Sequence, residues 1–123
     1  MTIFTKIFGE SVATIQALEV QEKLKKDNQV YILDVRQPDE FRMGHIAGAK
    51  LIPLGQLERR LNEVPKGRDI VCICATGHRS VPAVRELAAA GYTAASLKNG
   101  MIAWYRAKLP VTKGMSGQTI NSE

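Results

Sequence analysis

Residues Val71–Val81 read VCICATGHRSV, and they indicate the architecture more firmly than any other part of the chain. A continuous apolar run ends at Cys74, a turn containing Gly77 follows, and a helical pattern begins near Ser80. Apolar runs bounded by turn residues are typical of buried strands, and serine shortly before proline is typical of a helix start. We therefore expect a strand ending at Cys74, a loop, and a helix capped by Ser80 that stops before Gly91.

Strand and helix signals alternate on both sides of this stretch. In chain order they fall at 17–24 (helix), 29–35 (strand), 38–44 (helical turn), 54–61 (helix), 94–97 (strand) and 102–108 (helix). Repeated strand, helix, strand spacing favours an α/β fold. We expect a single domain with a central, mostly parallel sheet and helices on both faces.

Length and composition exclude several classes of protein. The 123 residues, 45% apolar and 24% charged, suit one globular domain. The net charge is +5, but the basic residues are scattered without interleaved aromatics, so we expect no nucleic-acid binding. No apolar run is long enough to cross a membrane, and the opening MTIFTKIFGE is not typical of a signal peptide. Two cysteines one residue apart make no disulfide framework, which favours a cytoplasmic location.

The ends of the predicted strands indicate where a functional site lies. Ligand crevices in open α/β sheets lie at the carboxyl ends of strands. Two strands here end in polar or reactive residues, Asp34 and Arg36 in one case and Cys74 in the other. Because a helix N-terminus and Arg79 follow Cys74, the surroundings favour a thiolate. We expect Cys74 to be a nucleophile, with Asp34 and Arg36 holding the site in shape.

Several stretches together resemble one known family. CATGHRS at 74–80, between an apolar strand and a helix, resembles the active-site loop of rhodanese-like sulfurtransferases. Upstream, LDVRQPDEFRMGHIAGAKLIPL resembles the family's strand-terminal DVR, its acidic-aromatic turn and its GHI-x-GA segment. Downstream, AAAGY and LKNGMIAWYRAKLPV resemble its last turn and helix. The resemblance covers roughly Thr14 to Val111.

The resemblance implies a sulfurtransferase of the thiosulfate:cyanide type that needs no cofactor. Cys74 would take sulfane sulfur from a small anionic donor, become a persulfide, and pass the sulfur to cyanide, a thiol or a protein acceptor. Loop N–H groups would hold the charged sulfur, and Gly77 would let the backbone curl. The expected site residues are Ala75, Thr76, Gly77, His78, Arg79 and Ser80. The alternative is a sulfur-relay carrier or protein-binding module that delivers persulfide sulfur to a protein partner.

Loop length and loop composition refine this expectation. Phosphatases and arsenate reductases on the related fold place one residue more between cysteine and arginine than the four that separate Cys74 from Arg79. The tighter ring suits a single extra sulfur atom. Ala75 and Thr76 stand where loops that favour thiosulfate carry basic side chains, so good thiosulfate turnover is not predicted.

The remaining cysteine and histidines are given supporting roles. Cys72 lies inside the predicted strand and is expected in the core. His78 is placed near the loop entrance, where it tunes charge, and His45 in a turn. With Cys74 these residues make a poor zinc set, so we expect no metal.

The chain is divided into three parts. We expect an N-terminal extension at 1–13, the rhodanese-like domain at 14–112, and a polar, mobile tail at 113–123. Apolar residues of the extension could pack on the domain, on a partner, or on a second copy of the chain in a weak homodimer. These residues are Ile3, Phe4, Ile7 and Phe8.

Overall fold

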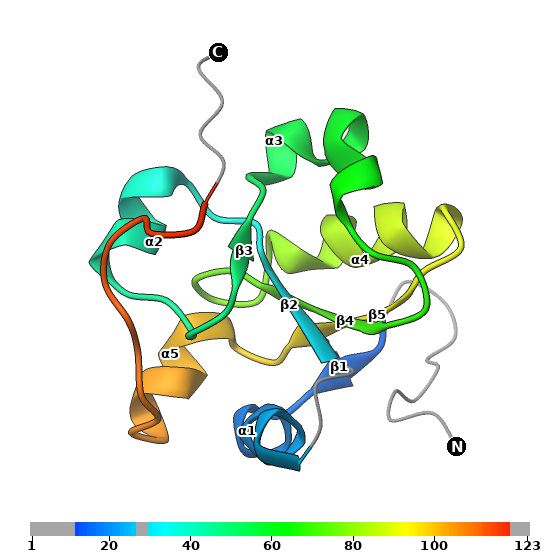
Figure 1. The fold of residues 1–123 in the computed structure, drawn as a ribbon. Coiled ribbons are helices and arrows are strands. Elements are labelled where there is room, and N and C mark those ends of the chain that lie inside the picture. The colour runs from blue at the N-terminus through cyan, green and yellow to red at the C-terminus, as the bar shows by residue number, and fades with distance from the viewer. Residues whose placement is uncertain (1–11, 27–29, 119–123) are drawn as a thin grey trace.

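The structure is a computed structural model that describes residues 12–26 and 30–118 (Figure 1). Within that part of the chain, a 5-stranded parallel sheet has the order β1-β5-β4-β2-β3. The strands are β1 Thr14–Ile15, β2 Val30–Asp34, β3 Lys50–Leu51, β4 Asp69–Ile73 and β5 Thr93–Leu97. The helices are α1 Ala17–Lys26, α2 Pro38–Met43, α3 Leu54–Leu57, the 3-10 helix η1 Glu58–Glu63, α4 Ser80–Ala89 and α5 Gly100–Arg106.

Helices cover both faces of the sheet, as Figure 1 shows for α1 and α5 on one side and α3 and α4 on the other. The side chains of β2 alternate accordingly. Ile32 packs in the core with Val20 of α1 and Trp104 of α5, whereas Leu33 packs in the core with Leu87 of α4. The predicted α/β class, with a parallel sheet and helices on both faces, is confirmed.

The central strand, β4, and its neighbour β2 end side by side. β2 and β4 pair in parallel, with Asp34 opposite Ile73. The segment after each strand therefore leaves the sheet at the same edge, as expected for a crevice at the carboxyl ends. This arrangement brings the chain after Asp34 and the chain after Ile73 into one region.

Some elements differ from the sequence-based expectation. The two-residue strands β1 and β3 were not predicted, because so short a strand carries no periodic signal. The predicted helix at 54–61 changes into η1 and kinks at Arg60, where φ is −116° and ψ is 16°. Ser80 is the first residue of α4 and not its N-cap, which is Arg79 without a side-chain capping bond.

The chain after the last helix returns to the sheet. The amide of Gln118 lies against β3, accepting a hydrogen bond from Leu51 N–H at 2.7 Å and donating to Ala49 O at 2.8 Å. Gly114 N–H donates to Arg42 O at 2.9 Å. The expected mobile tail therefore begins with a segment, 113–118, that is hydrogen-bonded to the domain. Residues 1–11, which include the apolar side chains of the expected extension, lie outside the described residues.

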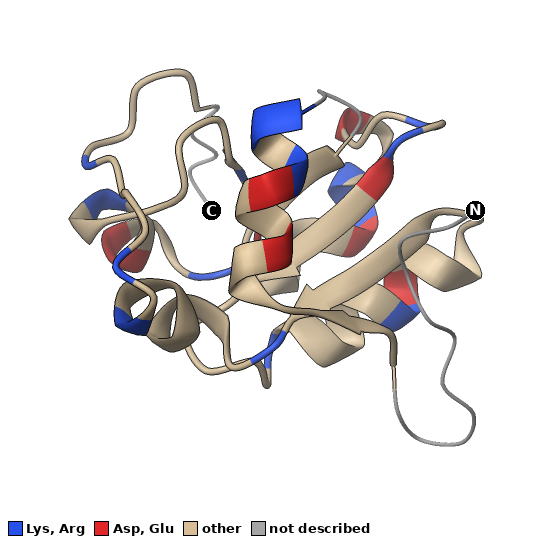
Figure 2. Cartoon of the chain, turned by 90° about the horizontal axis from the view of Figure 1, so that it is seen from below, with Lys and Arg blue, Asp and Glu red and all other residues tan. Residues whose placement is uncertain are grey.

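Positively and negatively charged residues are spread over the molecule. Figure 2 shows Lys and Arg spread over several elements, and α1 carries Glu19 as well as Lys23 and Lys26. No helix in the described ranges is long and apolar enough to span a membrane.

Candidate active site

Cys74 directly follows β4 and is completely buried. Its Sγ accepts hydrogen bonds from the backbone N–H of Gly77 at 3.0 Å and of Ser80 at 3.4 Å. Ser80 begins α4, so the positive end of that helix faces the sulfur. Converging backbone N–H groups stabilise negative charge, and the predicted curl of the loop around Cys74 is present.

Two hydroxyl groups, those of Ser80 and Ser96, form a hydrogen-bonded chain that starts at the sulfur. Ser80 Oγ accepts a hydrogen bond from the Cys74 thiol at 3.4 Å and lies 2.6 Å from Ser96 Oγ of β5. When the sulfur is deprotonated, Ser80 can donate to it while Ser96 donates to Ser80. Sequence reasoning missed Ser96. The available signal was a polar residue within a buried strand, since a buried hydroxyl needs a partner.

The start of α5 supports the base of the loop. Met101 N–H donates to Cys74 O at 2.9 Å, and Ile102 N–H donates to Ala75 O at 3.2 Å. Gly100 has φ +56°, and a Cβ there would collide with Cys74 O and with the backbone of Ala75. Only glycine permits this close approach.

The outer part of the loop is polar. Gly77 has φ +96° and turns the chain, as expected of a glycine at this position. Thr76 and His78 are exposed, and Thr76 Oγ1 lies 2.8 Å from His78 Nδ1. His78 therefore lies at the surface of the loop, where sequence reasoning placed it.

Arg79 forms a bidentate ion pair with Glu40 of α2. Both N–H···O distances are 2.7 Å, from Nη1 to Oε1 and from Nη2 to Oε2. These hydrogen bonds hold the pKa of Glu40 down at about 2 and raise that of Arg79 above its ordinary value. A Cys74 thiolate also raises the Arg79 pKa, so the two groups interact electrostatically. Glu40 was not among the expected site residues.

Asp34 and Arg36 form a second, buried ion pair. Arg36 Nε donates to Asp34 Oδ1 at 2.9 Å and Nη2 donates to Oδ2 at 2.8 Å. Nη2 also donates to Gly44 O at 2.8 Å. The pair therefore fastens the segment after β2 to the C-terminal end of α2. The charge of Asp34 also helps to raise the pKa of Arg79 in the loop, after the larger effect of Glu40.

Cys72 and His45 are buried among residues of the core. Burial, followed by the nearby Cys74, raises the pKa of Cys72 far above its ordinary value, and both thiols are free. His45 is buried, with Nδ1 2.8 Å from Phe41 O and its ring stacked on that of Phe41. In the described ranges, no group of three or more His, Cys, Asp and Glu side chains could hold a metal.

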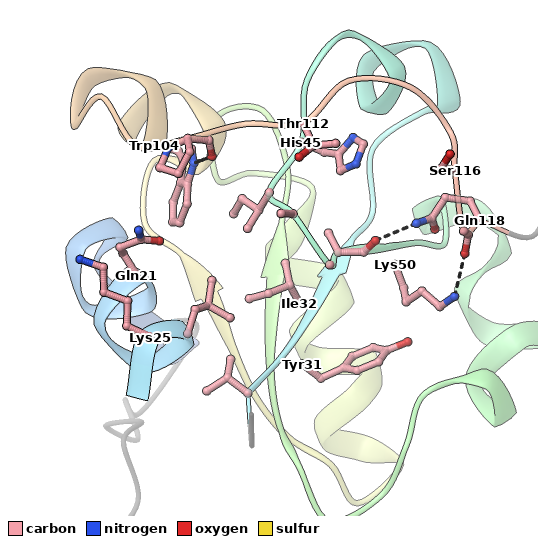
Figure 3. A pocket seen from close by; sticks show the side chains of 18 of the residues that line it. Gln21, Lys25, Tyr31, Ile32, His45, Lys50, Trp104, Thr112, Ser116 and Gln118 are labelled. Carbon is pink, nitrogen blue, oxygen red and sulfur yellow. Dashed lines mark hydrogen bonds between the residues drawn. The ribbon is translucent and has the colours of Figure 1, made fainter. Parts of the chain in front are cut away.

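A pocket of about 760 Å³ lies away from the loop (Figure 3). It opens between α1, the first half of β2, α5 and the returning C-terminal segment, with Tyr31, Trp104 and Gln118 among the labelled side chains. None of the described residues that line it belongs to 74–80. Cys74 is therefore held by its loop and lies outside this pocket.

Comparisons with known proteins agree with this geometry. The family described as "Rhodanese-like domain" matches residues 16–107. A sulfurtransferase of Allochromatium vinosum is 35% identical over 81% of this chain and 94% of its own length. A putative sulfur carrier protein of Bacillus subtilis is 36% identical over 68% of this chain and 45% of its own. The crystal structure of a rhodanese-related protein from Thermoplasma volcanium, 30% identical, has a TM-score of 0.77 and covers 82% of this chain and 98% of that one.

Proposed function

The chain belongs to the family of rhodanese-like domains, and on this premise we propose that it is a sulfurtransferase whose Cys74 carries the transferred sulfur. Relatives named sulfurtransferase and sulfur carrier support a rhodanese-type role in sulfur transfer. The observation that carries the assignment to Cys74 is the convergence of the Gly77 and Ser80 N–H groups on its Sγ. Such donors stabilise a sulfur anion both before and after it receives a second sulfur.

The first half-reaction loads the protein. The Cys74 thiolate attacks the sulfane sulfur of the donor, for example thiosulfate, and a new S–S bond forms. The S–S bond of the donor breaks, and its electron pair leaves with sulfite. Cys74 then bears a persulfide, and the total charge of the reactants is unchanged.

The second half-reaction unloads it. A nucleophilic acceptor, such as cyanide or a thiolate, attacks the outer sulfur of the Cys74 persulfide. The S–S bond breaks and returns its electron pair to Cys74, so the product is thiocyanate or a new persulfide. Each S–S bond made or broken is balanced by another bond to sulfur, and no external oxidant is required.

Sulfur loading of single-cysteine variants tests the proposal. After incubation with thiosulfate or a thiol persulfide, intact mass should show one added sulfur in the wild type and none in Cys74→Ser. Cys72→Ala is the matched control, because Cys72 lies within β4, before the loop, and we expect it to take no part in the reaction. That variant should load and discharge like the wild type and lose about 1 kcal/mol of stability as a small core truncation. Sulfur loading in folded Cys74→Ser would disprove the mechanism.

A second candidate is a sulfur-relay carrier, which the Bacillus subtilis relative favours. A carrier would load on Cys74 in the same way but discharge only to a protein partner. Loaded wild-type protein treated with cyanide or small thiols distinguishes the two. Rapid loss of the added sulfur mass supports the sulfurtransferase, and retention supports the carrier.

A further inference from the structure

The only arginine of the loop has its charge matched by a carboxylate. Both terminal nitrogens of Arg79 donate hydrogen bonds to the carboxylate of Glu40. That carboxylate is itself held in place, because its Oε1 also accepts a hydrogen bond from Gln37 N–H at 2.9 Å. Pro38 begins α2 and sets the direction of this first turn. The carboxylate is therefore preorganised for Arg79 at the mouth of the Cys74 loop.

A second guanidinium at this edge of the sheet, that of Arg36, is also paired with a carboxylate. Arg36 is buried against Asp34 and against Gly44 O. Ala75 and Thr76 bring no charge to the loop, and His78 is exposed and bonded to Thr76. Because Arg79 and Arg36 are each paired with a carboxylate, the attraction that the loop at 74–80 offers to an anion rests on its backbone N–H groups.

We propose that Glu40 is a specificity-determining residue that disfavours dianionic sulfur donors and leaves the site suited to thiol persulfides. This inference rests on the proposed sulfur transfer through Cys74. Glu40 does not touch the reacting sulfur, and it acts by cancelling the field of Arg79 where donors enter. The charge of both partners is secure at neutral pH, because their hydrogen bonds hold the pKa of Glu40 at about 2.

The two donor classes place different charge beside the thiolate. With thiosulfate, the Cys74 thiolate and the dianion form a persulfide anion and a sulfite dianion, so three negative charges crowd the loop. With a persulfide R–S–SH, the thiolate attacks the outer sulfur, the S–S bond breaks, and the thiol RSH leaves with the proton. Only one negative charge is then present throughout. A neutralised Arg79 weakens the first reaction and hardly affects the second.

The test compares Glu40→Gln with the wild type in single-turnover loading of Cys74. The glutamine amide still accepts from Gln37 N–H, so the start of α2 is kept while the charge is removed. Rates are measured by rapid quench and intact mass with thiosulfate and with the persulfide of 2-mercaptoethanol. Loading from thiosulfate should rise roughly tenfold, the lower end of what a focused field gives, and loading from the persulfide should stay within about twofold.

Two further variants separate the local effect from overall charge and from misfolding. Asp39→Asn makes the same change in net charge on the same helical turn, and it should leave both rates within about twofold of the wild type. The double variant Glu40→Gln/Arg79→Gln removes both members of the pair. Because the unpaired charge of Arg79 is then absent, this variant should load from thiosulfate roughly tenfold more slowly than Glu40→Gln.

The outcomes distinguish this inference from the proposed function. Unchanged thiosulfate loading in Glu40→Gln, an equal rise for both donors, or a double variant that loads from thiosulfate as fast as Glu40→Gln would overturn the role of Glu40 alone. Failure of wild type and variants to load from either donor would overturn the sulfur transfer itself, and this inference with it.

Discussion

Gly100 connects two parts of the chain at the reactive cysteine. Its missing side chain lets the first turn of α5 lie directly against the carbonyl of Cys74, and Met101 N–H then bonds that carbonyl. The Cys74 backbone is thereby held by α5, while the N–H groups of Gly77 and Ser80 hold the sulfur. Gly100 thus helps to fix the backbone that carries the Cys74 sulfur.

Gly100→Ala should therefore impair both stability and sulfur loading. The left-handed φ of +56° and the collision with Cys74 O and Ala75 together predict a loss of at least about 2 kcal/mol in the free energy of unfolding. Urea denaturation and loading by intact mass measure the two effects. Gly55→Ala is the control, because its Cβ meets no atom within 4 Å and alanine favours the helix. Equal behaviour of the two variants would show that the contact at Gly100 is unimportant.

Some residues of the candidate site could be predicted from the sequence, and others could not, for a physical reason. Cys74 and Gly77 lie within one continuous loop, so their spacing is readable directly. Glu40 is 39 positions from Arg79, and Ser96 is 16 positions from Ser80. Such pairs form only when the helix or strand that carries one partner docks beside the other, and local patterns do not report docking. Asp34 and Arg36 were placed correctly at a strand end, but their partner Gly44 was not foreseen.

Among the elements, α2 has the clearest link between sequence and chemistry. Pro38 starts it, and Glu40 in the same turn reaches both the Gln37 N–H and Arg79. Predicting α2 from proline and acidic residues succeeded because these signals are local. The change from α3 to η1 was not predicted, since apolar spacing does not distinguish the two kinds of helix over so few turns.

The ion pair of α2 should make stability depend on acid pH. The Glu40 pKa is lowered from 4.5 to about 2, so its contribution is complete above pH 4.5 and is lost as the pH falls toward 2. Wild type should be more stable than Glu40→Gln by up to about 1 kcal/mol at pH 7, because the pair is partly exposed. Urea denaturation at several pH values should show this difference shrinking below pH 4.5. In an Arg79→Gln background the same comparison should be much flatter, and a difference that persists at pH 2 would contradict the assignment.

Across the whole molecule, the returning C-terminal segment secures the edge of the sheet. The Gln118 side chain accepts a hydrogen bond from Leu51 N–H of β3 and donates one to Ala49 O. β3 is the last strand at that edge of the sheet. An unpaired edge strand is a template for unwanted pairing, and this amide partly covers it. The overall α/β class was predictable from alternating signals, but the return of this segment depends on contacts with residues much earlier in the sequence, 67 positions away for Leu51 and 69 for Ala49.

Gln118→Ala should lower the free energy of unfolding by about 1–3 kcal/mol, because it removes two hydrogen bonds and leaves the Leu51 N–H without its partner. Sulfur loading should remain, since the hydrogen bonds of the Gln118 side chain go to Leu51 and Ala49 and not to the Cys74 loop. Lys113→Ala, at an exposed position of the same segment, is the control and should be neutral. Stability unchanged in Gln118→Ala would mean that water replaces the amide at no cost.

The strand order has a consequence for biosynthesis. β5 lies between β1 and β4 although it is synthesised after both, so β1 waits for its neighbour until Leu97 has been translated. The support behind Cys74 arrives later still, with Met101 and Ile102. A nascent chain in which Cys74 has left the ribosome, but β5 and α5 have not, therefore lacks the hydrogen bonds that support Cys74. It also has an unpaired sheet edge, which is the kind of surface that chaperones bind. On the proposed mechanism, the thiol gains its full support for a second sulfur only after residues 101 and 102 have been translated.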